Sequence, residues 1–175
     1  MISIVTGNHK KFTEIETALQ SFQIDVQQAS VDLPELQTTD HVAVVTAKTL
    51  AAFQLMKSPV LVDDSGFYIE KYQQFPGVYS KDIYKMIGYA GLFALTAEGD
   101  RAAFHCYVGY MDNTLKEPMI FHATNDGSIT HQFDTGAAAT EYAVMPYIPL
   151  FTPDIPGSHH RIKTLNAFAE WYQSR

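Results

Sequence analysis

Cysteine and basic residues are both scarce in this sequence, and each scarcity excludes a class of protein. The single cysteine, Cys106, has no partner within the chain for a disulfide, so we expect a protein of the reducing cytoplasm. Its neighbours, such as Phe104 and Val108, are apolar and favour a buried structural thiol over a nucleophile. With 12 basic and 19 acidic residues, the formal charge of −7 argues against a general nucleic-acid-binding protein but leaves room for a nucleotide ligand.

Long hydrophobic runs are missing as well. No apolar stretch approaches the length of a membrane span, and the start of the chain has neither the basic leader nor the apolar segment of a signal peptide, so we expect no membrane partner. Hydrophobic residues make up 46% and charged residues 18% of the 175 residues, which is typical of a packed globular protein. A chain of this length predicts a single α/β domain over residues 1–175, either one ordinary domain or one of two closely joined lobes.

The hydrophobic periodicity alternates between strand and helix patterns. In the first part of the chain we predict a strand at 1–6, a helix from about His9 to Phe22, a strand at 24–31, a helix from a cap at Thr39 or Asp40 to about Lys57, and a strand at 60–62. A turn at 75–79 and short helices including 91–97 follow. The last part is predicted to contain strands at 102–111 and 118–124, an extension of the sheet at 127–133, and a closing helix from about 162 to 172. Residues 134–160 lack clear periodicity, as in a binding loop or a mobile flap. This order predicts an α/β protein with a mixed twisted sheet flanked by helices.

The apolar run Val60–Val62 leads directly into two adjacent acids, Asp63 and Asp64, and then a Ser-Gly pair. Because uncompensated carboxylates are costly to bury, we predict that the strand ends here and that the acids lie at its carboxyl end, where α/β proteins bind ligands. Carboxylate oxygens suit a hard divalent cation such as Mg²⁺. A surface turn rich in Asp, Ser and Gly explains the run equally well.

Three further features suit a phosphate. Residues Thr6–Lys11 join the first strand to the first helix, and a helix N-terminus attracts phosphate, although a capped and solvated helix start would have the same sequence. Lys48 shares a helical stripe with Val44 and Leu55, so it either snorkels to solvent or reaches a phosphate in a crevice. Glu35 lies in the connector before that helix, where an isolated glutamate is ordinarily solvated.

The last third of the chain carries histidines and aromatic residues. Residues Ser158–Arg161 open the final helix with two adjacent histidines, which do not share a helix face, so we expect no zinc site. Their donors suit carbonyl or phosphate oxygens. Aromatic side chains offer surfaces for a base, although core packing accounts for any single one of them: Phe133, Tyr142, Tyr147 and Phe151.

Taken in order, these pieces resemble the inosine/xanthosine triphosphate pyrophosphatase family, whose members remove non-canonical purine nucleotides. The matching segments are Thr6-Gly7-Asn8-x-x-Lys11-x-x-Glu14, Leu33-Pro34-Glu35-Leu36-Gln37, Lys48 within its helix, Asp63-Asp64-Ser65-Gly66, Phe75-Pro76-Gly77-Val78-Tyr79-Ser80 and Ala103-Phe104-His105-Cys106. The resemblance implies two lobes with a central cleft, and a homodimer. It also implies Mg²⁺-dependent hydrolysis of a nucleoside triphosphate to the monophosphate and pyrophosphate.

The resemblance implies residue roles as well. The triphosphate would be held by Lys48 and by the loop residues Thr6, Gly7, Asn8, His9, Lys10 and Lys11, and Ser65 would contact the substrate. Glu35 and Asp64 would bind Mg²⁺, Asp63 would support the metal, and Asp64 would be the catalytic base that orients water.

The last third of the chain departs from the family pattern. The family's Phe-Gly-Tyr-Asp-Pro segment has its nearest match in residues 145–151, with Ile148 in place of the acid, and the Lys-Asn pair before Ser-His-Arg has no counterpart. We align His160 and Arg161 with the end of Ser-His-Arg and expect them, with Tyr147 and Phe151, to contact the base. Altered base contacts change selectivity strongly. The alternative function is a nucleotide-binding or sensor protein that kept the phosphate site and lost turnover.

Overall fold

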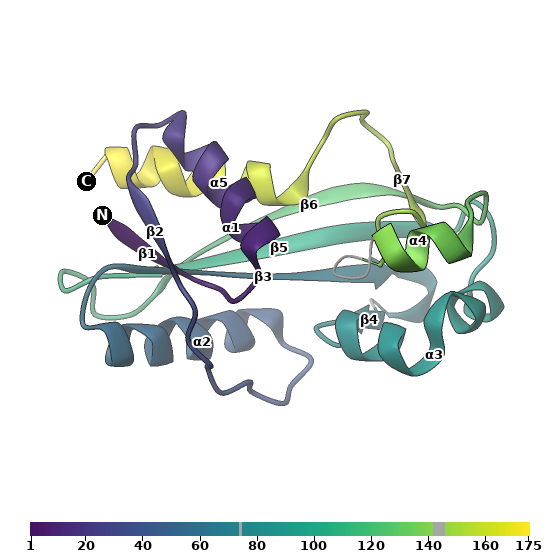
Figure 1. The fold of residues 1–175 in the computed structure, drawn as a ribbon, viewed down its shortest axis with the longest axis horizontal. Coiled ribbons are helices and arrows are strands. Elements are labelled where there is room, and N and C mark those ends of the chain that lie inside the picture. Colours follow the sequence, from purple (N-terminus) through teal and green to yellow (C-terminus); the bar gives the residue numbers. More distant parts are fainter. Residues whose placement is uncertain (74, 142–145) are drawn as a thin grey trace. The chain divides into compact units, whose positions relative to one another are not determined.

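The computed structural model describes residues 1–73, 75–141 and 146–175, and the chain forms two compact units (Figure 1). Unit 1 contains Met1–Ser65, Cys106–Ala123 and His160–Arg175, and unit 2 contains Gly66–His105 and Thr124–His159. The single domain of closely joined lobes and its central cleft stay predictions. Tyr142 and residue 145 of the altered segment lie outside the described residues.

Helices and strands alternate through most of the chain. Unit 1 contains β1 (Ile2–Val5), α1 (His9–Gln20), β2 (Val26–Ala29), α2 (His41–Met56) and α5 (His160–Gln173). Unit 2 contains the 3-10 helix Glu70–Tyr72, β4 (Phe75–Gly77), α3 (Ser80–Leu95), α4 (Thr135–Glu141) and β7 (Phe151–Pro153). Three strands contribute residues to both units: β3 (Val60–Ile69), β5 (Arg101–Met111) and β6 (Met119–Ile129). Within the described part of the chain, no helix is long and apolar enough to cross a membrane.

The strands form a mixed sheet in the order β2-β1-β3-β5-β6-β7, with β4 paired to β3. β1 runs parallel to β2 and to β3, whereas the pairs β3–β4 and β6–β7 are antiparallel. The parallel pairs follow from the early β-α-β alternation, because a helical crossover brings the chain back in the same direction. The predicted α/β fold with a mixed sheet and flanking helices is confirmed.

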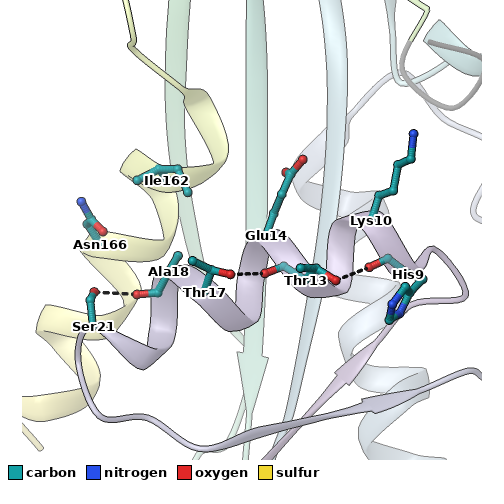
Figure 2. Close-up of a pocket in the computed structure, with 9 residues that line it drawn as sticks. All are labelled: His9, Lys10, Thr13, Glu14, Thr17, Ala18, Ser21, Ile162 and Asn166. Carbon is teal, nitrogen blue, oxygen red and sulfur yellow. Dashed lines mark hydrogen bonds between the residues drawn. The ribbon is translucent and has the colours of Figure 1, made fainter. Parts of the chain in front are cut away.

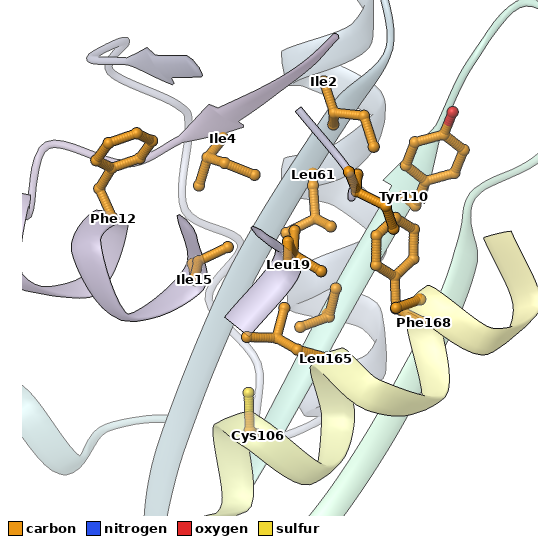
Figure 3. Packing of buried hydrophobic residues seen from close by; sticks show 13 residues of the cluster. Ile2, Ile4, Phe12, Ile15, Leu19, Leu61, Cys106, Tyr110, Leu165 and Phe168 are labelled. Carbon is orange, nitrogen blue, oxygen red and sulfur yellow. The ribbon is translucent and has the colours of Figure 1, made fainter. Parts of the chain in front are cut away.

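The core of unit 1 lies between the sheet and the helix pair α1 and α5 (Figure 3). Phe12 and Leu19 of α1 belong to this cluster with Leu61 of β3. On the other face of these strands, α2 packs over Val60 and Val62 (Figure 1). Successive residues of β3 therefore face different helices, as the pleat of a strand requires.

β3 is longer than predicted. It continues through Asp63 and Asp64 to Ile69, so the acids lie inside the strand, and the predicted strand end and Ser-Gly turn are wrong. The prediction failed because it treated the carboxylates as uncompensated. Both acids have cationic partners from other parts of the chain, and these charges offset the cost of removing the carboxylates from water.

The middle of the chain is also more regular than predicted. The expected turn at 75–79 begins with β4, and the expected short helices are present as the two parts of α3. α3 is broken at Gly88, whose φ of 57° lies in the left-handed region that glycine adopts readily. Residues 134–160 contain α4 and β7, and a mobile flap in this segment stays a prediction.

Candidate active site

Asp63 and Asp64 point to opposite faces of β3, because successive strand residues alternate. Asp63 meets Lys11 from α1 and Arg161 from α5, whereas Asp64 meets Lys48 from α2. The two adjacent acids therefore belong to separate clusters, and both clusters lie within unit 1.

The Asp64 cluster joins α2, β3 and the connector before α2. Lys48 Nζ donates hydrogen bonds to Asp64 Oδ2 and to Glu35 Oε1, each at 2.9 Å. His41 Nε2 lies 3.6 Å from the other carboxylate oxygen, Asp64 Oδ1. The Lys48 side chain is 15% exposed, so it reaches a carboxylate cluster instead of snorkelling to solvent. Glu35 is exposed and gives the cluster its solvent side.

The surroundings keep Asp64 and Lys48 charged. Burial acts to raise the pKa of Asp64, but the interaction with His41 and the positive charge of Lys48 outweigh it and lower that pKa to about 2. Burial acts to lower the pKa of Lys48, and the two carboxylates, Asp64 and Glu35, outweigh it and raise that pKa. At neutral pH the cluster therefore presents an ionised Asp64 carboxylate beside a protonated Lys48.

Asp63 is the buried anion of the second cluster. Its side chain is 1% exposed, its Oδ1 lies 2.7 Å from Lys11 Nζ, and its Oδ2 accepts hydrogen bonds from Arg161 Nε at 3.0 Å and from the Cys106 thiol at 3.3 Å. Arg161 is fully buried and also pairs with Glu14. This cluster ties α1 and α5 to β3.

Charge compensation in the Asp63 cluster fixes its ionisation states. Burial acts to raise the pKa of Asp63, but Arg161 and Lys11 outweigh it and hold that pKa well below its usual range. Burial and the neighbouring carboxylate raise the pKa of Cys106, and the prediction that its thiol is buried is confirmed. Both Asp63 oxygens already have partners. Its role as a metal support stays a prediction.

The loop Thr6–Lys11 ends in a capped helix. Asn8 Oδ1 accepts hydrogen bonds from the backbone N–H groups of Lys10 at 3.0 Å and Lys11 at 3.3 Å, which confirms the capping interpretation of this helix start. Phosphate binding by the loop stays a prediction, as does contact of Ser65 with a substrate.

The residues expected to contact a base are packed into the interiors of their units. In unit 2, the Tyr147 ring stacks on Phe67 with 4.8 Å between centroids, and its hydroxyl donates to the Ser80 carbonyl at 2.9 Å. Phe151 contacts the same Phe67 ring edge to face. In unit 1, His160 is buried at the start of α5, directly before the equally buried Arg161. Their base contacts stay predictions, and packing gives each a structural role.

Sequence reasoning gave no role to two residues of these clusters, His41 and Glu14. His41 lies two helical turns before Lys48 on α2, and Glu14 lies one turn after Lys11 on α1. Helical spacing alone could have placed His41 on the same helix face as Lys48, and Glu14 on the same helix face as Lys11. It could not have identified the strand residues and the α5 arginine that complete the clusters.

Close packing of α2 against β5 sets the position of Lys48. A Cβ atom added to Gly109 of β5 would lie 2.1 Å from Thr49 Oγ1 and 3.2 Å from Thr49 Cβ. Thr49 is fully buried, and its hydroxyl donates to the Val45 carbonyl at 2.7 Å. The missing side chain at Gly109 thus allows α2, which carries both His41 and Lys48, to approach the sheet.

We expect Gly109→Ala to lower the free energy of unfolding by about 1–3 kcal/mol, because the added methyl group must push α2 away from β5. Thr49→Ala in the same chain removes the nearest clashing atom and should recover part of the loss. Denaturant unfolding of the two single variants and the double variant measures this coupling. Gly136→Ala, at an exposed position of α4, is the control. A Gly109→Ala protein as stable as the wild type would contradict the close approach.

A groove of about 760 Å³ runs between α1 and α5 (Figure 2). It is lined by His9, Lys10, Thr13, Glu14, Thr17, Ala18, Ser21, Ile162 and Asn166. The hydroxyls of Thr13, Thr17 and Ser21 donate to carbonyls of α1 itself, so they are already satisfied. Glu14 connects this groove to the Asp63 cluster through Arg161, whereas the Asp64 cluster does not line it.

The Asp64 cluster contains two carboxylates that could hold a divalent cation. Glu35 and Asp64 direct carboxylate oxygens at one cationic nitrogen, so the two acids already converge on a positive charge. Among the described residues, no three His, Cys, Asp or Glu side chains form a complete metal-ligand group. Mg²⁺ is commonly held by one or two carboxylates together with substrate phosphates, and these two residues fit that pattern.

Comparisons with known proteins agree with the motifs and the fold. The chain is 32% identical to a dITP/XTP pyrophosphatase of Thermococcus kodakarensis, over 97% of this chain and 96% of that protein. It is 31% identical to a dITP/XTP pyrophosphatase of Methanosarcina acetivorans, over 99% and 98%. The solved structure of a HAM1 protein from Coxiella burnetii has the same fold, with a TM-score of 0.70 and 22% identity over the full length of both chains. The Ham1 family matches residues 2–170, and the chain belongs to this family.

Proposed function

We propose that this protein hydrolyses non-canonical purine nucleoside triphosphates to the monophosphate and pyrophosphate, with Mg²⁺. The observation that carries the proposal is Lys48 placed between Glu35 and Asp64, in a member of the Ham1 family. The substrate class is supported by the names of the relatives, which are dITP/XTP and inosine triphosphate pyrophosphatases.

The Asp64 cluster supplies what this hydrolysis needs. Water adds across the anhydride between the α and β phosphates, the bridging P–O bond breaks, and pyrophosphate leaves. Mg²⁺, held by Glu35 and Asp64, would neutralise phosphate charge and polarise the P–O bonds when bound. Lys48 offers a point charge to the phosphate oxygens. With a pKa of about 2, Asp64 stays ionised at neutral pH and is better suited to orienting water than to retaining a proton.

The proposal extends to the surroundings of the site. The loop Thr6–Lys11 would contribute phosphate contacts, and its exposed Lys10 supplies positive charge there. The protein would act in the cytoplasm, which its single buried cysteine supports. It would act as a homodimer, which the motif resemblance supports. Analytical ultracentrifugation at assay concentrations tests the dimer.

A product assay over a substrate panel tests the proposal. ITP, dITP, XTP, ATP, GTP and dTTP are each incubated with protein and Mg²⁺, and pyrophosphate, orthophosphate and monophosphate are quantified. We expect equal amounts of monophosphate and pyrophosphate, with the inosine and xanthosine substrates turned over at least about tenfold faster than ATP or GTP. Orthophosphate in place of pyrophosphate would contradict the bond assignment. Nucleotide binding without any product would favour the sensor function.

A further inference from the structure

His41 approaches the Asp64 carboxylate on the oxygen that Lys48 leaves open. Lys48 Nζ contacts Oδ2 at 2.9 Å, and His41 Nε2 lies 3.6 Å from Oδ1. The two partners come from one face of α2, two turns apart. Together they restrain the rotation of the carboxylate from both sides, whereas Lys48 alone would restrain one oxygen.

The imidazole of His41 is itself held by a stack of rings. Tyr107 of β5 lies against His41 with 4.7 Å between centroids and 17° between planes. The Tyr107 ring also stacks on His122 of β6 at 4.1 Å and 12°. The His41 side chain is 2% exposed, so this stack replaces solvent around the ring.

The start of α2 is fixed independently of the stack. Asp40 caps the helix, and its Oδ1 accepts hydrogen bonds from the N–H groups of Val42 at 2.9 Å and Ala43 at 3.1 Å. His41 is the first residue of the helix, directly after this cap. Backbone and ring are therefore both anchored, and the polar edge of the ring is directed at Asp64.

Packing alone does not account for this arrangement. A phenyl ring would fill the same volume and stack on Tyr107 equally well. What a phenyl ring cannot do is present a nitrogen to a carboxylate. Catalytic contacts of this kind are often long in the absence of substrate and tighten in the reacting complex.

Resting on the proposed function, we propose that His41 is a positioning residue: it holds the Asp64 carboxylate in the orientation that orders the attacking water, and the Tyr107–His122 stack holds His41. The role acts on the rate of the chemical step and not on nucleotide affinity. Loss of a partner that orients a ligating carboxylate lowers activity by about 10- to 100-fold.

Two substitutions separate positioning from packing. His41→Phe keeps the ring and the stack but loses the nitrogen, and His41→Gln loses the stack but keeps a hydrogen-bond donor. For each variant, kcat and KM for ITP are measured with saturating Mg²⁺, the melting temperature is recorded, and the affinity for a non-hydrolysable ITP analogue with Mg²⁺ is determined by calorimetry. His131, which stacks on Phe93 in unit 2, receives the same two substitutions as the matched control.

The proposal predicts opposite orders for activity and stability. His41→Phe should melt close to the wild type and lose at least about tenfold in kcat, with KM and analogue affinity nearly unchanged. His41→Gln should melt lower and yet keep the higher kcat of the two. Activity that instead follows melting temperature, or wild-type kcat in His41→Phe, would overturn the positioning role while leaving the proposed function standing. Absence of pyrophosphate release by the wild type would overturn both.

Discussion

Asp64→Asn is expected to reduce pyrophosphate release by about 10³-fold while leaving the fold intact. Asparagine has the shape of aspartate but no negative charge, so the cluster loses the ion pair with Lys48 and one of the two carboxylates proposed to hold Mg²⁺. The fold should tolerate the change because Lys48 keeps its bond to Glu35. Steady-state turnover of ITP and thermal unfolding measure the two effects separately.

The control for this substitution is Asp82→Asn, which removes an exposed carboxylate of α3 that lies 3.7 Å from Lys85. It should leave turnover and melting temperature within error of the wild type. An Asp64→Asn protein that turns over ITP at a near-normal rate would remove Asp64 from the mechanism. If Asp64→Asn loses activity only because the protein unfolds, the claim that Asp64 has a chemical role is also contradicted.

Arg161→Ala is expected to destabilise the protein by about 3–5 kcal/mol, the cost of removing one partner of a buried ion pair. Asp63 would retain only Lys11 as a cationic partner in a site where its side chain is 1% exposed, and Glu14 would lose its contact with α5. At about 2–4 °C per kcal/mol for a chain of this size, the melting temperature should fall by roughly 10 °C.

Arg101→Ala is the matched control, because Arg101 forms a bidentate ion pair with Asp154 on the surface of unit 2. Exposed pairs of this kind contribute about 0–1 kcal/mol. The comparison also distinguishes the two roles considered for Arg161. A loss of stability as small as that of Arg101→Ala, together with altered preference among bases, would favour base recognition over the anchoring of Asp63.

The local parts of the fold could be predicted from the sequence. Phe12, Ile15 and Leu19 mark the buried face of α1 by their spacing, and Asp40 marks the start of α2 by its capping side chain. The length of β3 could not be predicted in this way. Its continuation through Asp63 depends on Lys11 and Arg161, which come from distant segments of the chain.

The candidate site was predictable in composition but not in arrangement. Glu35, Lys48 and Asp64 could be named from sequence, and the structure brings these three together. The separation of Asp63 from Asp64 follows from strand alternation, which becomes visible only once β3 is known to continue through both residues.

The aromatic residues show a different limit. Tyr147 and Phe151 carry surfaces suited either to a base or to a core, and single residues give no signal that separates the two. Tyr147 stacks on Phe67 and Phe151 contacts the same ring edge to face, which shows core packing within unit 2. A pattern that has no periodicity in sequence can still fold into α4 and β7, because contacts with the aromatic core supply the order that local spacing does not.

The most direct test of the central claim, that the Asp64 cluster is a metal-dependent centre for pyrophosphate release, is a Mg²⁺ titration of ITP turnover after the protein has been freed of metal with EDTA. The account predicts no measurable pyrophosphate without Mg²⁺, a saturable return of activity as Mg²⁺ is added, and no return in Asp64→Asn. Pyrophosphate release that persists in excess EDTA, or that Asp64→Asn recovers with the same Mg²⁺ dependence as the wild type, would contradict it.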